Sequence, residues 1–329
     1  MMKKVYLIAA VLLLMTMVSA CTERKDANQS HSEKFNLTIT ENTGADVTVL
    51  KSKCCILDER KGNLKTVVRL EHNAQYSLTY CDAKNGIVYY VTNEDGSRRG
   101  GDQLYSYDMN TGNHRQLTEG IYAINFIVPI NENKLLLVAV VGGTHNISPL
   151  CYDIKSGKLE SWEWDDDFFV NYAFRDSQTG TVYISGYSNA KDYQMRDQLN
   201  NREIEKYGID NYIYKIDKDG KYEKIFTCKD RYITSFAVNG KVILCMTKVE
   251  SFDDANYKVV RYDVDSKEEK TLKNISIPGD IIDLDDSEEN VYSSTGGQII
   301  KTNLSLGTEE TIYKVDREKE YINNAQRLP

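Results

Sequence analysis

The sequence repeats one short pattern along most of its length, and this repetition limits the possible folds more than any other feature. Each copy is a strand-like run that ends in Asp or Asn, followed by a turn and a second short run. The residues that end the first run are Asp58, Asp108, Asp153, Asp217, Asp263 and Asn303. Subtracting successive numbers gives spacings of 50, 45, 64, 46 and 40 residues. Repeats of this length are in the range of propeller blades.

A second hairpin precedes most copies. In the clearest case, Asn85-Gly86 separates the alternating apolar runs 77–82 and 87–92, which is a strong short-range hairpin signal. Four short antiparallel strands per unit are typical of a β-propeller blade. The sequence therefore predicts an all-β chain forming a β-propeller with six blades of four antiparallel strands. The alternatives are seven blades, a β-sandwich, or two smaller all-β domains.

The first blade lacks a clear inner pair of strands. We expect this pair from Phe35 to Leu50, with the C-terminal segment Tyr321 to Leu328 as a further contributor. A strand from one end of the chain that completes a blade at the other end would close the ring. Closure also removes exposed strand edges, which otherwise favour aggregation.

The ends of the third strands resemble those of TolB-like six-bladed bacterial propellers. The matching residues are Tyr107-Asp108, Tyr152-Asp153, Ile216-Asp217 and Tyr262-Asp263. The resemblance covers most of the chain after its N-terminal region, but it concerns architecture, because Asp before a turn is common in hairpins. It implies the fold, and it transfers no functional residue to this chain.

The N-terminus has the three parts of a secretory signal peptide. Lys3 and Lys4 are positive, residues 5–18 form an apolar run, and Ser19 and Ala20 are small. The alternative is a transmembrane helix, which needs about 20 apolar residues, more than this run provides. We therefore predict a signal peptide over residues 1–20.

The end of this leader carries a more specific motif. Val18-Ser19-Ala20-Cys21 resembles the lipobox of bacterial lipoproteins. In that family the cysteine thiol receives a diacylglycerol and becomes the first residue of the mature chain. The resemblance implies a protein that is held in the lipid bilayer of a cell membrane through acylated Cys21 and faces outside the cytoplasm. An ordinary leader with an accidental cysteine is the alternative.

The residues after Cys21 predict a tether and one folded domain. Ala27 is the only apolar residue between Thr22 and Lys34, so residues 21–34 should form a flexible tether. Residues 35–329 then form a single propeller domain. The net charge of -8 argues against a nucleic-acid partner, whose phosphates need a basic surface.

The other six cysteines lie mostly inside apolar strand patterns, where a lone cysteine behaves as a small hydrophobic residue. We predict free buried thiols, with disulfides as the alternative in an exported chain. The six residues are Cys54, Cys55, Cys81, Cys151, Cys228 and Cys245.

The lengths of the connections predict a binding face. In an up-and-down blade, turns between the first and second strands and between the third and fourth lie at one end of the ring, and these are short here. The remaining connections are longer and mixed in chemistry, and long loops on a rigid scaffold usually carry binding. The candidate contact residues on them are Arg98, Arg99, His145, Trp162, Trp164, Arg231, Tyr232, Phe252, Asp253 and Tyr257.

The longest connection, 188–211, is predicted to be a helix-bearing insertion beside the same face. Met195, Leu199, Ile204 and Tyr207 recur at roughly helical spacing within it. A solvated decoration without a role is the alternative.

No catalytic, cofactor or metal motif is present. The sequence lacks H-E-x-x-H, G-x-S-x-G, a P-loop and G-x-G-x-x-G. The consecutive residues 165–167 are all Asp, but their side chains should point in different directions. We predict no catalytic residue, no cofactor and no metal site.

These observations favour a non-catalytic binding or scaffold module for a protein, a peptide or a glycan. The alternative is an exported lyase or hydrolase with its site at the mouth of the central channel. Convergent carboxylates beside a His or Tyr with raised pKa values would favour the enzyme. A broad exposed aromatic surface would favour the binding module.

Overall fold

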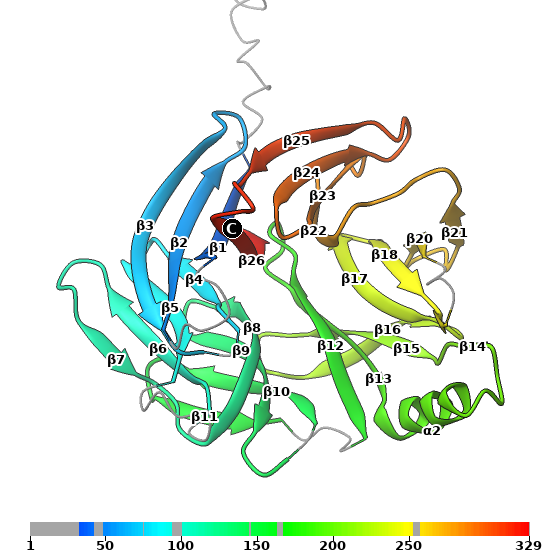
Figure 1. Ribbon diagram of the computed structural model, residues 1–329, viewed down its shortest axis with the longest axis horizontal. Coiled ribbons are helices and arrows are strands. Elements are labelled where there is room, and N and C mark those ends of the chain that lie inside the picture. Colours follow the sequence, from blue (N-terminus) through cyan, green and yellow to red (C-terminus); the bar gives the residue numbers. More distant parts are fainter. Residues whose placement is uncertain are drawn as a thin grey trace, which may run out of the picture. The chain divides into compact units, whose positions relative to one another are not determined.

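The computed structural model describes residues 33–42, 49–74, 76–93, 101–144, 146–162, 167–252 and 257–328. Within them, six antiparallel four-stranded sheets are arranged in a ring as the blades of a β-propeller (Figure 1). The predicted fold class and number of blades are confirmed. The leader, Cys21 and most of the tether lie outside the described residues. None of the helices in the described ranges has the length and apolar character needed to cross a bilayer.

The strands of each blade are given from the ring axis outward. Blade 1 consists of β26 (Glu320–Arg327), β1 (Lys34–Glu41), β2 (Leu50–Asp58) and β3 (Asn63–His72). Blade 2 consists of β4 (Thr79–Asp82), β5 (Ile87–Thr92), β6 (Gln103–Asp108) and β7 (His114–Gln116). Blade 3 consists of β8 (Ile121–Asn131), β9 (Lys134–Val141), β10 (Ile147–Asp153) and β11 (Lys158–Ser161).

The second half of the ring follows the same order. Blade 4 consists of β12 (Phe168–Arg175), β13 (Val182–Ser188), β15 (Asn211–Ile216) and β16 (Tyr222–Cys228). Blade 5 consists of β17 (Tyr232–Asn239), β18 (Val242–Lys248), β20 (Lys258–Asp263) and β21 (Glu269–Leu272). Blade 6 consists of β22 (Asp280–Leu284), β23 (Asn290–Ser294), β24 (Gln298–Asn303) and β25 (Glu309–Lys314).

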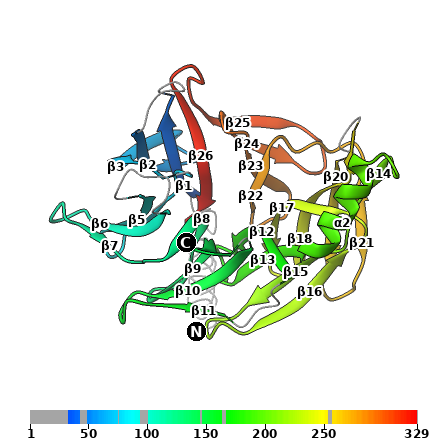
Figure 2. The same cartoon turned by 60° about the horizontal axis from the view of Figure 1, so that its bottom comes forward.

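The ring closes through β26, which pairs antiparallel with β1 from Phe35↔Arg327 to Glu41↔Glu320. Figures 1 and 2 show the red β26 beside the blue β1. The expected contribution of the C-terminal segment is thus confirmed. The placement of an inner pair over Phe35 to Leu50 is wrong, because this stretch supplies only the second strand of blade 1. A regular alternation in sequence does not reveal which strand occupies the inner position.

Apolar side chains fill most of the space between blades. Ile127 and Leu150 of blade 3 pack with Tyr80 of blade 2 in one cluster, and Phe35 of blade 1 packs with Tyr292 of blade 6 in another. Each sheet is buried on both faces by its neighbours, which explains continuous apolar runs such as residues 135–140 in β9. The core is therefore a circle of blade interfaces rather than one central cluster.

The interface between blades 1 and 2 combines apolar clusters with buried polar contacts near the inner strands. The Nδ2 of Asn36 donates to the Thr79 carbonyl at 2.8 Å, and its Oδ1 accepts from the Cys81 amide at 3.0 Å. The hydroxyl of Thr38 lies 2.8 Å from that of Thr79. A buried group with its hydrogen bonds satisfied does not incur the large cost of an orphaned one.

The six cysteines after Cys21 are all free and buried, as predicted. Burial raises the pKa of the Cys228 thiol to about 12. A thiol with a raised pKa carries little of the thiolate that reacts.

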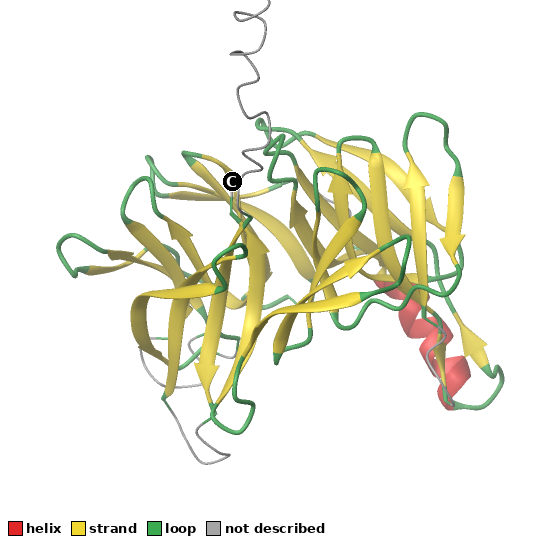
Figure 3. Cartoon of the chain, turned by 90° about the horizontal axis from the view of Figure 1, so that it is seen from above, coloured by secondary structure: helices red, strands yellow, loops and turns green. Residues whose placement is uncertain are grey.

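The insertion contains one helix, α2 (Asn189–Asn200), and a short strand β14 (Lys206–Tyr207), which pairs with β19 (Glu250–Ser251) (Figure 3). The helix begins where the Ser188 hydroxyl accepts a hydrogen bond from the Lys191 amide. It ends earlier than the helical spacing suggested, and Arg202 has a left-handed φ of 58°. Ile204 and Tyr207 are therefore outside the helix.

The insertion is packed against the ring and is not a solvated decoration. Leu199 and Tyr207 form a buried cluster with Tyr232 of β17. Asp192 is buried beneath them, where it pairs with Arg196 and accepts hydrogen bonds from the hydroxyls of Tyr207 and Tyr232.

We expect Asp192→Ala to loosen the insertion while the ring stays folded. The change leaves two buried phenol hydroxyls without an acceptor, at a cost of about 3 kcal/mol. Amide hydrogen exchange should speed up across residues 189–207 and stay unchanged in β8 and β9. Asp197→Ala, at an exposed position of the same helix, is the control. Equal exchange rates in both variants would contradict the anchoring role of Asp192.

Candidate functional site

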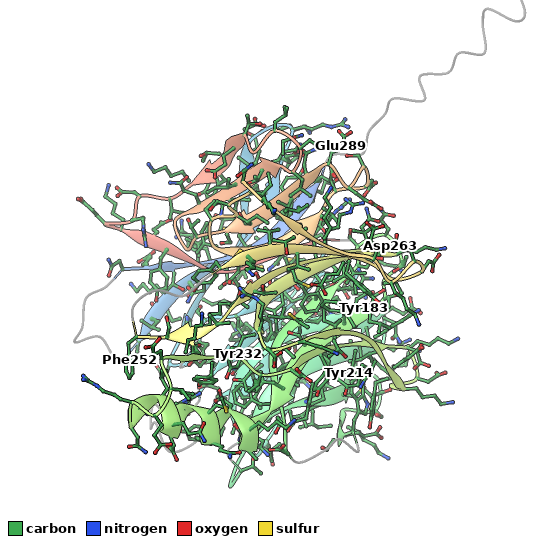
Figure 4. All side chains as sticks on the ribbon, turned by 90° about the vertical axis from the view of Figure 1, so that its right-hand side faces the viewer. Tyr183, Tyr214, Tyr232, Phe252, Asp263 and Glu289 are labelled. Carbon is green, nitrogen blue, oxygen red and sulfur yellow. The ribbon has the colours of Figure 1, made fainter. Side chains whose placement is uncertain are left out.

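The connections separate into two ends of the ring, as the sequence predicted. We call the end where the inner strands begin the loop face; it holds the connections between second and third strands and between blades. The opposite end, with the short turns, is the turn face. Figure 4 shows Phe252 and α2 at one end of the blades and Asp263 and Glu289 at the other.

A hollow of about 780 Å³, here called the channel mouth, opens at the loop face. Every blade contributes to its lining, through the inner strand or the residues directly before it. The contributing residues include Tyr76, Ser77, Asn125, Asn171, Tyr172, Thr234, Asp280, Ile282, Asn323 and Asn324. The hollow therefore lies where the axis of the ring meets solvent.

Bulges in the inner strands supply several of its polar side chains. An extra residue interrupts pairing with the second strand at Asn125 in β8, Asn171 in β12, Thr234 in β17, Ile282 in β22 and Asn323 in β26. All five line the channel mouth. A bulge leaves one residue unpaired and re-aims its side chain. The same local irregularity thus places an uncharged polar group at the mouth in four blades.

These polar groups differ in whether they are already engaged. Asn171 donates to the Ile233 carbonyl and accepts from the Ser185 hydroxyl at 3.0 Å, so it ties β12 to its neighbours. The side chains of Asn125 and Asn323 make no hydrogen bond to any other residue in the described ranges. An amide offers donors and an acceptor together, and these two are open to a ligand.

A second hollow of about 500 Å³ continues the channel mouth outward between blades 5 and 6. It shares Thr234, Gly279 and Asp280 with the mouth and ends at Tyr257. We call the two hollows together the groove. Gly279 has a φ of +75°, and a Cβ there would lie 2.0 Å from the Ser294 carbonyl oxygen, so this junction requires glycine.

Asp280 lies at the junction of the two hollows. Solvent reaches its side chain, but the walls of the groove remove much of its hydration, and this desolvation raises the pKa of the carboxyl. Tyr172 lies close enough for the Asp280 charge to contribute to its raised pKa, although burial is the main cause. The Tyr172 hydroxyl already donates to the Ile281 carbonyl.

Exposed aromatic and aliphatic side chains concentrate on the loop face. Of the nine large hydrophobic residues that are exposed in the described ranges, seven belong to connections or strand starts of this face. These are Val49, Tyr76, Tyr122, Tyr193, Phe252, Tyr257 and Tyr321. Such a concentration is typical of an interaction surface.

The predicted contact residues have different locations. Phe252 and Tyr257 are exposed on the loop face, at 60% and 56%. Arg231 instead donates to the hydroxyl and the carbonyl of Thr247 at 2.9 and 3.2 Å, bracing β18. The Tyr232 ring is buried under the insertion and cannot contact a ligand from solution without displacing it.

Trp162 also lies away from the groove. Its indole contacts the turn between β15 and β16, where a Cβ on Gly220 would be 2.7 Å from Nε1. The ring therefore packs between blades 3 and 4 towards the turn face. Five other candidates are outside the described residues: Arg98, Arg99, His145, Trp164 and Asp253.

The bulged residues and Asp280 were not among the residues predicted from the sequence. A signal was present, because the inner strands share a β-branched residue followed by Asn or Thr. The pairs are Ile124-Asn125, Val170-Asn171, Ile233-Thr234 and Ile322-Asn323. In the described ranges, His, Cys, Asp and Glu side chains form no group of three or more that could hold a metal ion.

Comparisons with known proteins support the fold. No protein-family model and no curated protein matches the sequence. A chain in the crystal structure of a nidogen/laminin complex is similar at a TM-score of 0.56 and 9% identity, over 90% of this chain and 98% of that one. TolB from Acinetobacter baumannii is similar at 0.52 and 15% identity, over 90% of this chain and 65% of TolB. At such identities the likeness shows a TolB-like propeller fold alone.

Proposed function

We propose that this protein is an exported lipoprotein whose propeller binds a glycan without chemically changing it. The groove supports this proposal most directly, because open amides and exposed aromatic rings lie along its two adjoining hollows. Amides hydrogen-bond sugar hydroxyls in both directions, and aromatic rings provide flat apolar surfaces for the sugar faces. Acylated Cys21 would hold this domain at the membrane and leave the groove outside the cytoplasm.

The shape of the groove favours a chain-like ligand over a compact one. Its two hollows extend from Tyr76, beside blade 2, through Asp280 to Tyr257, in the connection of blade 5. The volume of each hollow lies within the usual range for a small-ligand site, about 300–1,000 Å³. A linear oligosaccharide can occupy both hollows, with one sugar beside each tyrosine.

We expect Asn125→Ala combined with Asn323→Ala to weaken glycan binding about tenfold or more. Each amide contributes about 1 kcal/mol through hydrogen bonds, and about 1.4 kcal/mol is tenfold in affinity. The full chain in detergent is first screened on an oligosaccharide array, and the best ligand is then titrated by calorimetry. Asn113→Ala, on the turn face, is the matched control.

Two outcomes would contradict this proposal. One is that no oligosaccharide binds, and the other is that the double variant binds as tightly as the wild type. A peptide array is screened in parallel. Peptide binding that depends on Asn125 and Asn323 would assign the groove to peptides instead.

An exported lyase or hydrolase is the second candidate, and Asp280 is the observation that favours it. Desolvation raises the pKa of the Asp280 carboxyl, and a carboxyl with a raised pKa in a hollow is a candidate for proton transfer. However, Asp280 is the only carboxylate among the described residues that line the groove, and Tyr172 already donates to a backbone carbonyl. Mass spectrometry of the bound oligosaccharide after incubation decides between the two. Cleavage by the wild type but not by Asp280→Asn would establish the enzyme.

The anchor has its own test. We expect Cys21→Ser to move the full chain from the detergent phase to the aqueous phase in a Triton X-114 separation. Each buried methylene of an acyl chain contributes about 0.8 kcal/mol to membrane binding. Without Cys21 no acyl chain is attached, and the anchor is lost. Cys54→Ser is the control and should stay in the detergent phase. Detergent partitioning of Cys21→Ser would refute lipidation at this residue.

A further inference from the structure

The turn face has a cavity of its own, with a volume of about 830 Å³. Residues of blades 1, 2 and 3 form most of its wall, and Arg175 reaches it from the end of β12 in blade 4. It shares no lining residue with either hollow of the groove. Nothing in the proposed glycan site therefore accounts for it.

The cavity wall carries an excess of positive charge in a chain whose net charge is -8. Its charged residues are Lys34, Lys61, Lys65, Lys84 and Arg175, against Asp58, Asp82 and Glu132.

All three carboxylates have partners nearby. Lys61 lies 4.0 Å from Asp58, and Lys84 lies 3.4 Å from Glu132. Asp82 accepts from the backbone and side-chain nitrogens of Asn85 at 3.1 and 2.7 Å. Lys34, Lys65 and Arg175 remain without an ion pair to any described residue.

Arg175 is the most unusual of these three. Its Nε and Nη1 are buried and have no hydrogen-bond partner. The adjacent Asp176 makes no ion pair with it; this carboxylate instead accepts from the Gln178 amide at 2.9 Å and the Thr179 hydroxyl at 2.6 Å. Buried polar atoms nearly always have partners. Desolvation of this half-buried guanidinium lowers its pKa, and the nearby Asp176 charge opposes that effect only in part. An anion beside Arg175 would offset the cost of this desolvation.

Two phenols add neutral donors to the same wall. The rings of Tyr80 and Tyr89 stack with their planes 14° apart, and their hydroxyls make no hydrogen bond to another described residue. Burial raises the pKa of Tyr80, and it raises the pKa of Tyr89 to about 12, so both keep their protons. Tyr80 and Arg175 line the same cavity. The Arg175 charge lowers the pKa of the Tyr80 phenol, whereas burial, the larger effect, raises it.

We propose that this turn-face cavity binds the carboxylate or phosphate group of a small anionic molecule, with Arg175 as the central cation. The guanidinium forms strong charge-assisted hydrogen bonds with either group. The hydroxyl of Tyr80 donates beside it, and Lys34 and Lys65 attract further negative charge on the ligand. The volume is in the range of small-molecule sites, about 300–1,000 Å³. This site is independent of the groove and of the anchor.

Titration of the full chain with citrate and with inorganic phosphate, at ionic strength held constant with sodium chloride, tests the proposal. We expect saturable binding by calorimetry for at least one of the two anions. Arg175→Gln should weaken it by about tenfold or more, because a hydrogen bond to a charged group is lost. Lys65→Gln should weaken it by a smaller factor. Lys218→Gln, an exposed lysine of the turn face, is the control and should bind as the wild type does.

Citrate binding more tightly than phosphate would assign a carboxylate ligand, and the reverse order would assign a phosphate. Multivalent anions also stabilise proteins without binding, by exclusion from the surface. Thermal unfolding of the same four proteins in each anion separates this effect from binding. Stabilisation common to all four proteins without saturable heats would overturn the proposal, as would unweakened binding by Arg175→Gln. If Arg175→Gln does not fold, the double variant Lys34→Gln/Lys65→Gln replaces it, and unchanged affinity in that variant is the contrary result.

Discussion

Deletion of residues 320–329 is expected to leave the chain without a cooperative unfolding transition. These residues include β26, the inner strand of blade 1, which pairs with β1 along its length. Ile322 and Ala325 of β26 are buried among residues of blades 1 and 6. A folded domain is stable by only about 5–15 kcal/mol. Losing an inner strand together with the contact between first and last blades removes most of that stability.

The readout is thermal unfolding followed by near-ultraviolet circular dichroism. The truncated chain should show a broad, weak change where the wild type shows a sharp one. Adding a synthetic peptide of residues 318–329 should restore the sharp transition, because the missing strand can pair in trans. Asn323→Ala is the control within the same strand, since its side chain lines the channel mouth. A sharp transition of the truncated chain at the wild-type temperature would mean that the ring does not depend on β26.

The sequence predicted the ring because its turn signals are local. Asn85-Gly86 and the Asp residues that end third strands determine the turn chemistry within a few residues, whatever surrounds them. Gly86 and Gly112 adopt the left-handed φ values of 69° and 75° that such turns need. A repeat of local signals at the length of a blade is enough to identify the architecture. The number of blades then follows from counting the copies.

The interface between blades 1 and 2 was beyond the reach of such reasoning. Asn36 and Thr38 are polar and would be assigned to a solvated face by alternation alone, yet both are fully buried. They are satisfied by Thr79 and Cys81, more than forty positions away in sequence. Polar contacts over such separations depend on the register between blades, which no short window of sequence contains.

The groove opens at the end of the ring where loop length placed the candidate contact residues, but most of the residues that line it were not predicted. Loop length identified the loop face, and Phe252 and Tyr257 are exposed there. However, the open amides of Asn125 and Asn323 lie within strands, where a polar residue is usually assigned to a solvent-facing position. A bulge shifts the alternation by one residue, so side chains after it point differently from what the pattern predicts.

Tyr232 shows the opposite error, because its position at a strand start on the loop face suggested exposure. Its hydroxyl and ring are covered by the insertion, through Asp192 and Tyr207. The sequence indicated a helix there but not what the helix covers. An insertion of this kind both hides residues of the ring and adds its own exposed ones, such as Tyr193.

Arg327→Leu is expected to destabilise the propeller by about 3–5 kcal/mol, the usual cost of removing one partner of a buried ion pair. Arg327 Nη1 in β26 lies 2.6 Å from Asp283 Oδ2 in β22, and their side chains are only 10% and 2% exposed. This pair joins the first and last blades beside the closing strand. The variant leaves the Asp283 charge buried without its cation.

The double variant Arg327→Leu/Asp283→Leu should recover most of the loss. Well-packed apolar residues can replace a buried ion pair at little cost, because the desolvation penalty of both charges disappears. Urea unfolding of the wild type, both single variants and the double variant forms a complete cycle. Lys241→Leu breaks the exposed pair with Asp265 and should change stability little. A loss for Arg327→Leu no larger than that of Lys241→Leu would show that apolar packing and β26 pairing close the ring without help from this ion pair.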